Sequence, residues 1–295
     1  MGMIETTGLT KDYGNGKGIF NVNIEVKKGE VFGFLGPNGA GKTTTIRNLM
    51  GFIRPDSGTC RIKGMDCFAQ ADKIQEKLGY LAGEIAFLED VTGVQLLEFI
   101  ADMKGIKDRT RMQKLMERFE LDPRGKVKKM SKGMKQKIGI IAAFMNDPDV
   151  IILDEPTSGL DPLMQNRFVD LVLEEKKKGK TILMSSHIFE EVERTCDRTA
   201  IIRNGKIVAI ENMEELSKKK QKTYLVTFRN EEEAARAKQD DFQIVEEYKT
   251  MFTIETNEPL KDFFAKLSKY DIKDFDLKKQ SLEEIFMHYY GEEGK

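Results

Sequence analysis

The residues best suited to chemistry begin with a glycine-rich segment close to the N-terminus. It has the spacing G-x-x-x-x-G-K-[ST] and consists of Gly36, Pro37, Asn38, Gly39, Ala40, Gly41, Lys42 and Thr43. An apolar run, 31–35, precedes it, and a helix-like stretch from Thr44 to Met50 follows. A loop between a strand and a helix can wrap its backbone around an anion and point the free N–H groups of the helix at it. The context therefore predicts a phosphate-binding loop and argues against a chance glycine-rich turn.

The side chains of this loop have separate expected tasks. Lys42 is expected to reach the terminal phosphates of a nucleotide, and Thr43 is expected to bind Mg²⁺. The backbone of the loop and of Thr44, at the start of the helix, is expected to hold the other phosphate oxygens.

A second segment ends in two adjacent carboxylates. The apolar run 150–153 leads into Asp154 and Glu155. A continuous apolar run is typical of a parallel strand buried on both faces, and the carboxyl ends of such strands form ligand sites. We expect Asp154 to hold Mg²⁺, directly or through water, and Glu155 to act as the general base on an attacking water. The alternative, an acidic pair that begins a helix, suits the turn-forming residues 154–158 but leaves the upstream phosphate loop without a partner.

Together, and in this order, these segments resemble the ATP-binding cassette (ABC) family, over roughly residues 1–215. Ser131 and Gly133 match the family signature LSGGQ, whereas Lys132 and Met134 depart from it. The resemblance implies that Ser131 and Gly133 bind the nucleotide.

Three further positions match family motifs. Asp161 closes a segment, 158–161, that matches the D-loop, which implies communication with a second site. His187 follows an apolar run and two serines, as the switch histidine of the family does, and is implied to hold the γ-phosphate and Glu155 in register. Taken alone, it fits a core-facing histidine at a strand end equally well. Tyr13 occupies the place where the family stacks an aromatic ring on adenine.

One motif is altered. The family places a glutamine after a strand that resembles 78–81, but this chain has Gly83 and Glu84 there. Either residue can stand in for the glutamine. We choose Glu84, because its carboxylate can still contact Mg²⁺ or the water.

The resemblance implies an α/β fold of the P-loop NTPase type. The expected cassette, residues 1–217, has a mixed sheet core, an antiparallel β subdomain and a helical subdomain at about 85–145. The pattern of apolar residues indicates amphipathic helices at 92–104 and 109–120, and a helix that begins after Ser131. The alternating run 19–26 predicts a half-exposed strand.

A second cassette is also implied, because the P-loop and the signature lie in different subdomains. In the family, each ATP is held by Lys42 of one chain and Ser131 of another, so we expect a homodimer or a heterodimer. The expected ligands are ATP and Mg²⁺.

The pattern of elements restarts after residue 217 and predicts a C-terminal α+β domain, 218–295. Its expected order is βαββαβα, as in a ferredoxin-like unit. Strands are predicted at 223–229, 242–248, 251–256 and 272–277, and helices at 231–238, 259–270 and 281–290. No catalytic constellation occurs there, and packing, dimer contact and regulation stay open as its role.

Composition limits the partners. The chain has 295 residues and a net charge of −1, which does not favour nucleic acid. Its longest apolar stretch, 138–145, is far shorter than the ~20 residues of a membrane helix. Three cysteines without a C-x-x-C pattern indicate free thiols and no zinc site. We expect a cytoplasmic protein at the inner face of the membrane, bound to a separate integral-membrane permease through 80–92, with Phe87 and Leu88 as candidate contacts.

The resemblance therefore implies an ATP-hydrolysing subunit of an ABC transporter, similar to those that export sodium, drugs or antimicrobial peptides. A non-transport ABC ATPase acting on DNA or the ribosome is the alternative, but such proteins usually carry coiled coils, zinc modules or a second cassette. A cassette that binds ATP and hydrolyses it poorly is a third possibility, against which Glu155 and His187 argue.

Overall fold

A computed structural model describes residues 2–85, 88, 90–219 and 222–278. The chain divides into two compact units, Met1–Met213 and Glu214–Lys295. This boundary lies a few residues before the one expected from the sequence. Each unit has its own hydrophobic core.

An antiparallel sheet opens the first unit. Its strand order is β2-β1-β4-β5, with bounds β1 (Ile4–Asp12), β2 (Gly18–Val26), β4 (Ser57–Ile62) and β5 (Met65–Asp66). Buried and exposed residues alternate along most of β2. The half-exposed strand predicted at 19–26 is confirmed.

The second sheet of this unit has six strands in the order β10-β9-β3-β8-β7-β6. The bounds are β3 (Val31–Leu35), β6 (Leu78–Leu81), β7 (Val150–Asp154), β8 (Thr181–Ser186), β9 (Arg198–Arg203) and β10 (Lys206–Asn212). All neighbours are parallel except β10 and β9, which are antiparallel. Every residue of β3, β7 and β8 is buried, as their apolar runs predict.

This parallel register decides where the chemical groups meet. Leu35 pairs with Ser186, and Asp154 pairs with Ser185. The carboxyl ends of β3, β7 and β8 therefore lie at one edge of the sheet, where open α/β sheets bind ligands. The P-loop, the acidic pair and His187 all follow these strand ends.

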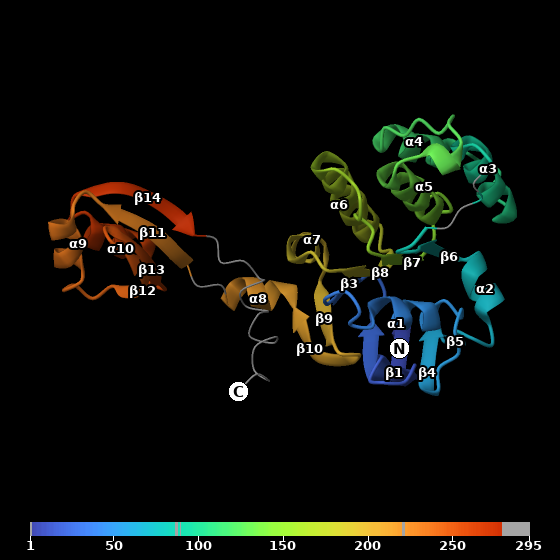
Figure 1. Ribbon diagram of the computed structural model, residues 1–295, viewed down its shortest axis with the longest axis horizontal. Helices are drawn as coiled ribbons and strands as arrows, with labels where there is room; N and C mark the ends of the chain where they lie inside the picture. Colours follow the sequence, from blue (N-terminus) through green and yellow to red (C-terminus); the bar gives the residue numbers. More distant parts are fainter. Residues whose placement is uncertain (1, 86–87, 89, 220–221, 279–295) are drawn as a thin grey trace. The chain divides into compact units, whose positions relative to one another are not determined.

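Helices pack around the sheets of the first unit (Figure 1). They are α1 (Lys42–Leu49), α2 (Ala71–Glu76), α3 (Gly93–Met103), α4 (Thr110–Arg118), the 3₁₀ turn η1 (Val127–Lys129), α5 (Lys132–Phe144), α6 (Pro162–Lys177) and α7 (Phe189–Thr195). A further helix, α8 (Met213–Lys219), begins at the boundary between the two units.

The three helices predicted from apolar spacing are present as α3, α4 and α5, which Figure 1 shows gathered beside β6 and β7. A capping box of Thr92 and Gln95 begins α3. The Ser131 hydroxyl accepts the backbone N–H of Met134 and caps α5.

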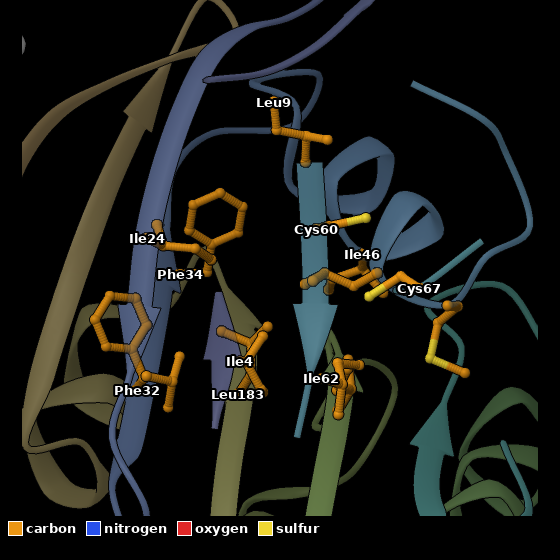
Figure 2. Close-up of a cluster of buried hydrophobic side chains, with 14 of the residues drawn as sticks. Ile4, Leu9, Ile24, Phe32, Phe34, Ile46, Cys60, Ile62, Cys67 and Leu183 are labelled. Carbon is orange, nitrogen blue, oxygen red and sulfur yellow. The ribbon is translucent and has the colours of Figure 1, made fainter. Parts of the chain in front are cut away.

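The main core of the first unit lies between the antiparallel sheet, the six-stranded sheet and α1 (Figure 2). Phe32 and Phe34 of β3 are fully buried there, and Ile46 of α1 packs into the same cluster. The P-loop thus connects two elements anchored in one core, which fixes its ends. Cys60 and Cys67 are buried free thiols in this core, in agreement with the sequence.

In its described residues, the second unit contains an antiparallel sheet and two helices besides α8. Its order is β12-β13-β11-β14, with bounds β11 (Lys222–Phe228), α9 (Glu231–Ala237), β12 (Gln243–Tyr248), β13 (Met251–Thr256), α10 (Leu260–Leu267) and β14 (Ile272–Lys278). The chain order βαββαβ is that of a ferredoxin-like unit. The helix predicted at 281–290 lies outside the described residues.

Among the residues that the structure describes, no helix is both long enough and apolar enough to cross a membrane.

Candidate active site

A cavity of about 490 Å³ opens at the carboxyl edge of the six-stranded sheet. It is lined by Tyr13, Gly16, Lys17, Gly18, Pro37, Asn38, Gly39, Gly41, Lys42, Thr43, Thr44, Glu155, Asn204 and Gly205. Gly36 and Ala40, the other two residues of the predicted loop, do not line the cavity. Most of the residues predicted to bind a nucleotide therefore surround one cavity.

The P-loop conformation depends on Gly41, the last residue before α1. Its φ is +113°, and a Cβ atom there would lie 2.7 Å from Cγ2 of Ile19. A side chain is excluded both by the backbone conformation and by the neighbouring strand. The loop can therefore turn tightly into α1, whose first N–H groups are left without helical partners and suit a phosphate.

Lys42 is buried, and its ammonium group points back across the loop. Its Nζ donates to the carbonyl oxygen of Gly36 at 2.6 Å and of Pro37 at 3.2 Å. It also lies 3.0 Å from Oε1 of Glu155. The positive charge is thus placed between the phosphate loop and the expected catalytic base.

Glu155 is held from two sides. Its other carboxylate oxygen, Oε2, lies 2.5 Å from Nδ1 of His187, and its backbone N–H donates to Oγ of Ser185 at 3.1 Å. Its φ is +49°, a left-handed conformation that non-glycine residues rarely adopt. The structure brings Lys42, Glu155 and His187 together as the sequence predicts, because β7 and β8 end side by side.

Asp154 lies behind Glu155 and is completely buried. Ser185 Oγ donates to its Oδ1 at 2.5 Å, whereas its Oδ2 has no hydrogen-bond partner. Burial raises the pKa of this carboxyl, while the hydroxyls of Ser185 and of nearby Thr43 act in the opposite direction. A buried carboxylate oxygen without a partner is costly unless a cation or donor meets it, so this site fits Mg²⁺.

The donor set near Asp154 is small. In the described part of the chain, no group of three or more His, Cys, Asp or Glu side chains is arranged to hold a metal. A Mg²⁺ ion suits such a site, because it is usually held by one or two protein oxygens and by substrate phosphates.

Of the two candidates for the missing glutamine, Gly83 and Glu84, the structure brings the backbone of Gly83 close to this carboxylate. A Cβ atom built on Gly83 would lie 3.0 Å from Oδ2 of Asp154, so Gly83 borders the buried carboxylate. Glu84 is exposed and lines a separate cavity of about 930 Å³. The turn after β6 thus brings Gly83 close to Asp154, and a side chain at this position would crowd the carboxylate.

The signature residues lie elsewhere in the unit. Ser131 caps α5, and a Cβ atom on Gly133 would lie 2.6 Å from the carbonyl oxygen of Gly159. Asp161 caps α6 by accepting the backbone N–H of Met164 at 3.0 Å. Of the described residues that line the nucleotide cavity, none belongs to the signature or the D-loop. One chain therefore presents the P-loop and the signature as separate surfaces.

The sequence reasoning missed several residues of the site. Gly16, Lys17 and Gly18 extend the cavity wall beyond Tyr13, and the Asn204-Gly205 turn closes its other side. The glycine-rich composition after Tyr13 and the Asn-Gly dipeptide were the available signals.

Gln136 and Glu191 were also missed, and both are buried close to Glu155 or Ser186. Gln136 contacts the backbone of Glu155. Glu191 accepts a hydrogen bond from Oγ of Ser186 at 2.6 Å, and burial raises its pKa to about 7.

Comparison with known proteins identifies the family. A family profile described as "ABC transporter" matches residues 19–158, and one described as "ATP-binding protein DrrA1-3-like, C-terminal domain" matches residues 212–290. The bacitracin transport ATP-binding protein BcrA of Bacillus licheniformis is 34% identical over 99% of this chain and 87% of its own length. The chain belongs to the ATP-binding proteins of ABC transporters.

Other comparisons agree with this assignment. The linearmycin resistance ATP-binding protein LnrL of Bacillus subtilis is 37% identical over 70% of this chain and 68% of its own length. A solved structure described as the ATP-binding subunit of an ABC transporter has 31% sequence identity and a TM-score of 0.67, covering 73% of this chain and 92% of that one. This ABC protein is an ATPase subunit of a transporter, and the fold class predicted from the sequence is confirmed.

Proposed function

We propose that this ABC ATPase powers the export of a substrate through a separate integral-membrane permease. The observation that carries the proposal is the similarity to the bacitracin transport protein over 99% of the chain, which includes the C-terminal unit as well as the cassette. Another relative is named as a linearmycin resistance protein, and export of an antibiotic is one way in which an ATP-binding protein can supply resistance. The substrate class would then be an antibiotic or a related compound.

ATP binding is supported by the shape and the charge of the cavity. The ring of Tyr13, which is 54% exposed at the cavity wall, would stack on the adenine. The phosphates would lie on the P-loop, and Lys42 would turn from the two loop carbonyls and Glu155 toward them.

Asp154 and Thr43 would hold Mg²⁺ beside the phosphates. The ion would neutralise charge on the phosphate oxygens and so favour attack on the γ-phosphorus. Asp154 suits this task because its Oδ2 is buried without a partner.

Hydrolysis would be directed by Glu155 and His187. Glu155 would accept a proton from the attacking water. The water oxygen would bond to the γ-phosphorus while the bond from that phosphorus to the ADP oxygen breaks. His187, 2.5 Å from Oε2 of Glu155, would hold the carboxylate in place and contact the γ-phosphate. Little covalent work falls to the protein in phosphoryl transfer, so positioning and charge dominate.

A second cassette would complete each site. The N-terminus of α5, with Ser131 and Gly133, is a helix start that suits a phosphate, but it does not line this chain's own cavity. Two cassettes in head-to-tail arrangement would place it over the partner's ATP. ATP would then favour the closed pair, and hydrolysis would favour separation. The partner would be a second copy or a related chain.

The permease would dock on the groove of about 930 Å³ between α2, β6 and α3. Two exposed apolar side chains line it, Phe52 at 53% and Met103 at 73% exposure. Exposed apolar surface of this kind often marks a protein interface. Leu88, one of the contacts predicted from sequence, is 57% exposed, whereas Phe87 lies outside the described residues.

This proposal can be tested by affinity capture of tagged Glu155→Gln protein from native membranes in Mg-ATP, followed by mass spectrometry. We expect one multi-span membrane protein at a stoichiometric level. Met103→Glu should reduce its recovery and leave ATP hydrolysis by the free protein unchanged. Val208→Glu, which charges an exposed apolar residue of β10 outside the groove, is the matched control and should not reduce recovery.

Capture of ribosomal or DNA-bound proteins without a membrane protein would contradict the transporter proposal and favour a non-transport ABC ATPase. Equal recovery with Met103→Glu and Val208→Glu would place the permease contact on another surface. Export itself would be contradicted if cells lacking the chain accumulated less of an antibiotic instead of more.

A further inference from the structure

We propose that Gln136 is a positioning residue for the catalytic base, and that it fixes Glu155 by holding the backbone on which that carboxylate stands. This inference rests on the proposed role of Glu155 in hydrolysis. Gln136 lies in α5, the helix that begins at the signature, and it is not among the described residues that line the nucleotide cavity.

The side chain of Gln136 is only 2% exposed, and its amide is directed at one turn of backbone. Nε2 donates to the carbonyl oxygen of Glu155 at 3.1 Å and to that of Pro156 at 2.8 Å. A glutamine amide carries two N–H groups, so each carbonyl can receive its own donor. A buried amide whose two N–H groups both donate to successive backbone carbonyls fixes the orientation of those two peptide groups.

The turn that Gln136 holds is strained. Glu155 has φ +49°, and its carbonyl oxygen also accepts the backbone N–H of Ser158 at 3.2 Å. A left-handed conformation at a residue with a side chain persists only when its surroundings enforce it. The two hydrogen bonds from Gln136 of α5 stabilise this left-handed backbone of Glu155.

The direction of the Glu155 carboxylate follows from this backbone. In the left-handed conformation, its two oxygens reach Lys42 at 3.0 Å and His187 at 2.5 Å. A return to an ordinary negative φ would rotate the side chain away from both partners. Gln136 would therefore act on hydrolysis through Glu155, while the walls that bind ATP stay unchanged.

Further contacts join the start of α5 to the loop 155–161 that follows β7. Lys132 Nζ donates to Ser158 Oγ at 2.7 Å, and Gly133 packs against the carbonyl of Gly159. These contacts are made by the first turn of α5, whereas the buried Gln136, one turn further on, bonds to the carbonyls of Glu155 and Pro156. The helix α5, which would contact the ATP of the partner cassette, is thus bonded to the backbone of Glu155, the expected general base of its own chain.

Steady-state ATP hydrolysis and nucleotide binding by Gln136→Glu and Gln136→Leu test this proposal. Both substitutions remove the donors and nearly keep the volume. A misplaced catalytic group costs up to about a hundredfold in rate. We expect kcat to fall at least about tenfold, with KM and the Kd of a fluorescent ATP analogue within about twofold of wild type. The control is Gln165→Leu, which removes a half-buried amide bonded at 3.1 Å to the carbonyl of Leu160 and should leave kcat unchanged.

A double-mutant cycle separates positioning from a general loss of structure. If Gln136 acts through Glu155, Gln136→Leu should cause no further loss of residual hydrolysis in the Glu155→Gln background. An equal loss in both backgrounds would overturn the proposal, as would a kcat within twofold of wild type for both single variants. If the Glu and Leu variants fail to fold, Gln136→Met supplies the same comparison with a more adaptable side chain.

Hydrolysis by wild type and by Glu155→Gln tests the role of Glu155 separately from that of Gln136. A wild-type protein that releases no phosphate, or a Glu155→Gln variant that hydrolyses at the wild-type rate, would contradict the role of Glu155 itself. Normal hydrolysis by the Gln136 variants, with Glu155→Gln inactive, would overturn only the role of Gln136.

Discussion

The ammonium of Lys42 and the carboxylate of Glu155 lie 3.0 Å apart, although they follow different strands and are separated by more than a hundred residues in sequence. The pair links the phosphate loop directly to the residue that we assign to water activation. Because ATP phosphates would draw Lys42 toward themselves, nucleotide binding and the state of Glu155 are coupled. Both residues can therefore be tested by separating binding from hydrolysis.

Lys42→Ala should abolish tight nucleotide binding. The ammonium forms charge-assisted hydrogen bonds in a buried loop, and loss of such a bond costs about 1.5–3 kcal/mol, or roughly tenfold to a hundredfold in affinity. Isothermal titration with Mg-ATP measures the effect. Lys63→Ala removes another lysine that is paired with a carboxylate, Asp149 at 2.6 Å, and should bind ATP normally. Unchanged affinity in Lys42→Ala would remove this residue from the site.

Tyr13→Ala should weaken the binding of ATP and GTP to a similar extent. Stacking of a base on an aromatic ring contributes about 1–3 kcal/mol and does not depend strongly on the base. We expect a loss of about tenfold in affinity, measured by displacement of a fluorescent nucleotide. Tyr13→Phe keeps the ring and should keep the affinity. If Ala and Phe at this position bind equally well, the stacking role is wrong.

Glu191→Gln should change how stability depends on pH. Burial raises the pKa of Glu191 from 4.5 to about 7, so the folded protein keeps its proton where the unfolded chain has lost it. The stabilising contribution of this group is therefore full below pH 4.5 and is lost as the pH rises through 7. A shift of this size corresponds to roughly 3 kcal/mol, since one pKa unit is about 1.4 kcal/mol.

Urea denaturation at pH 5 and pH 8 checks this expectation. Glu191→Gln cannot ionise and should be more stable than the wild type at pH 8, with a smaller difference at pH 5. Its amide oxygen can still accept the hydrogen bond from Ser186. Glu190→Gln changes the exposed neighbour and should show no such pH dependence. A constant difference between Glu191→Gln and wild type at both pH values would contradict the raised pKa.

Much of the fold could be predicted because the local signals agree with the final environment. The apolar runs at 31–35 and 150–153 become central strands buried on both faces. The resemblance to a known family then supplied the order of the motifs. Together these fixed the neighbours of Lys42, Glu155 and His187 before their distances were known.

Other parts could not be predicted, because they depend on contacts between distant segments. No local pattern marks Gln136 as a partner of Glu155, since the two meet only when α5 packs beside the end of β7. Side-chain chemistry alone favours Glu84 as the replacement for the glutamine, but it could not show that the turn after β6 brings Gly83 against Asp154. The Asn204-Gly205 turn predicts a hairpin but not that the hairpin closes a cavity.

The central claim is that Glu155 drives the hydrolysis of ATP bound on the P-loop, and one measurement tests it most directly. Phosphate release by wild type and by Glu155→Gln should be compared at saturating Mg-ATP, with sedimentation of both proteins in the same buffer. General-base catalysis contributes about 10²–10⁴-fold. We predict that the variant loses at least about a hundredfold in rate, keeps or strengthens ATP binding because Lys42 is freed, and sediments as a stable dimer. Hydrolysis at the wild-type rate would contradict the assignment of the base, and a monomer at saturating Mg-ATP would contradict the paired cassettes.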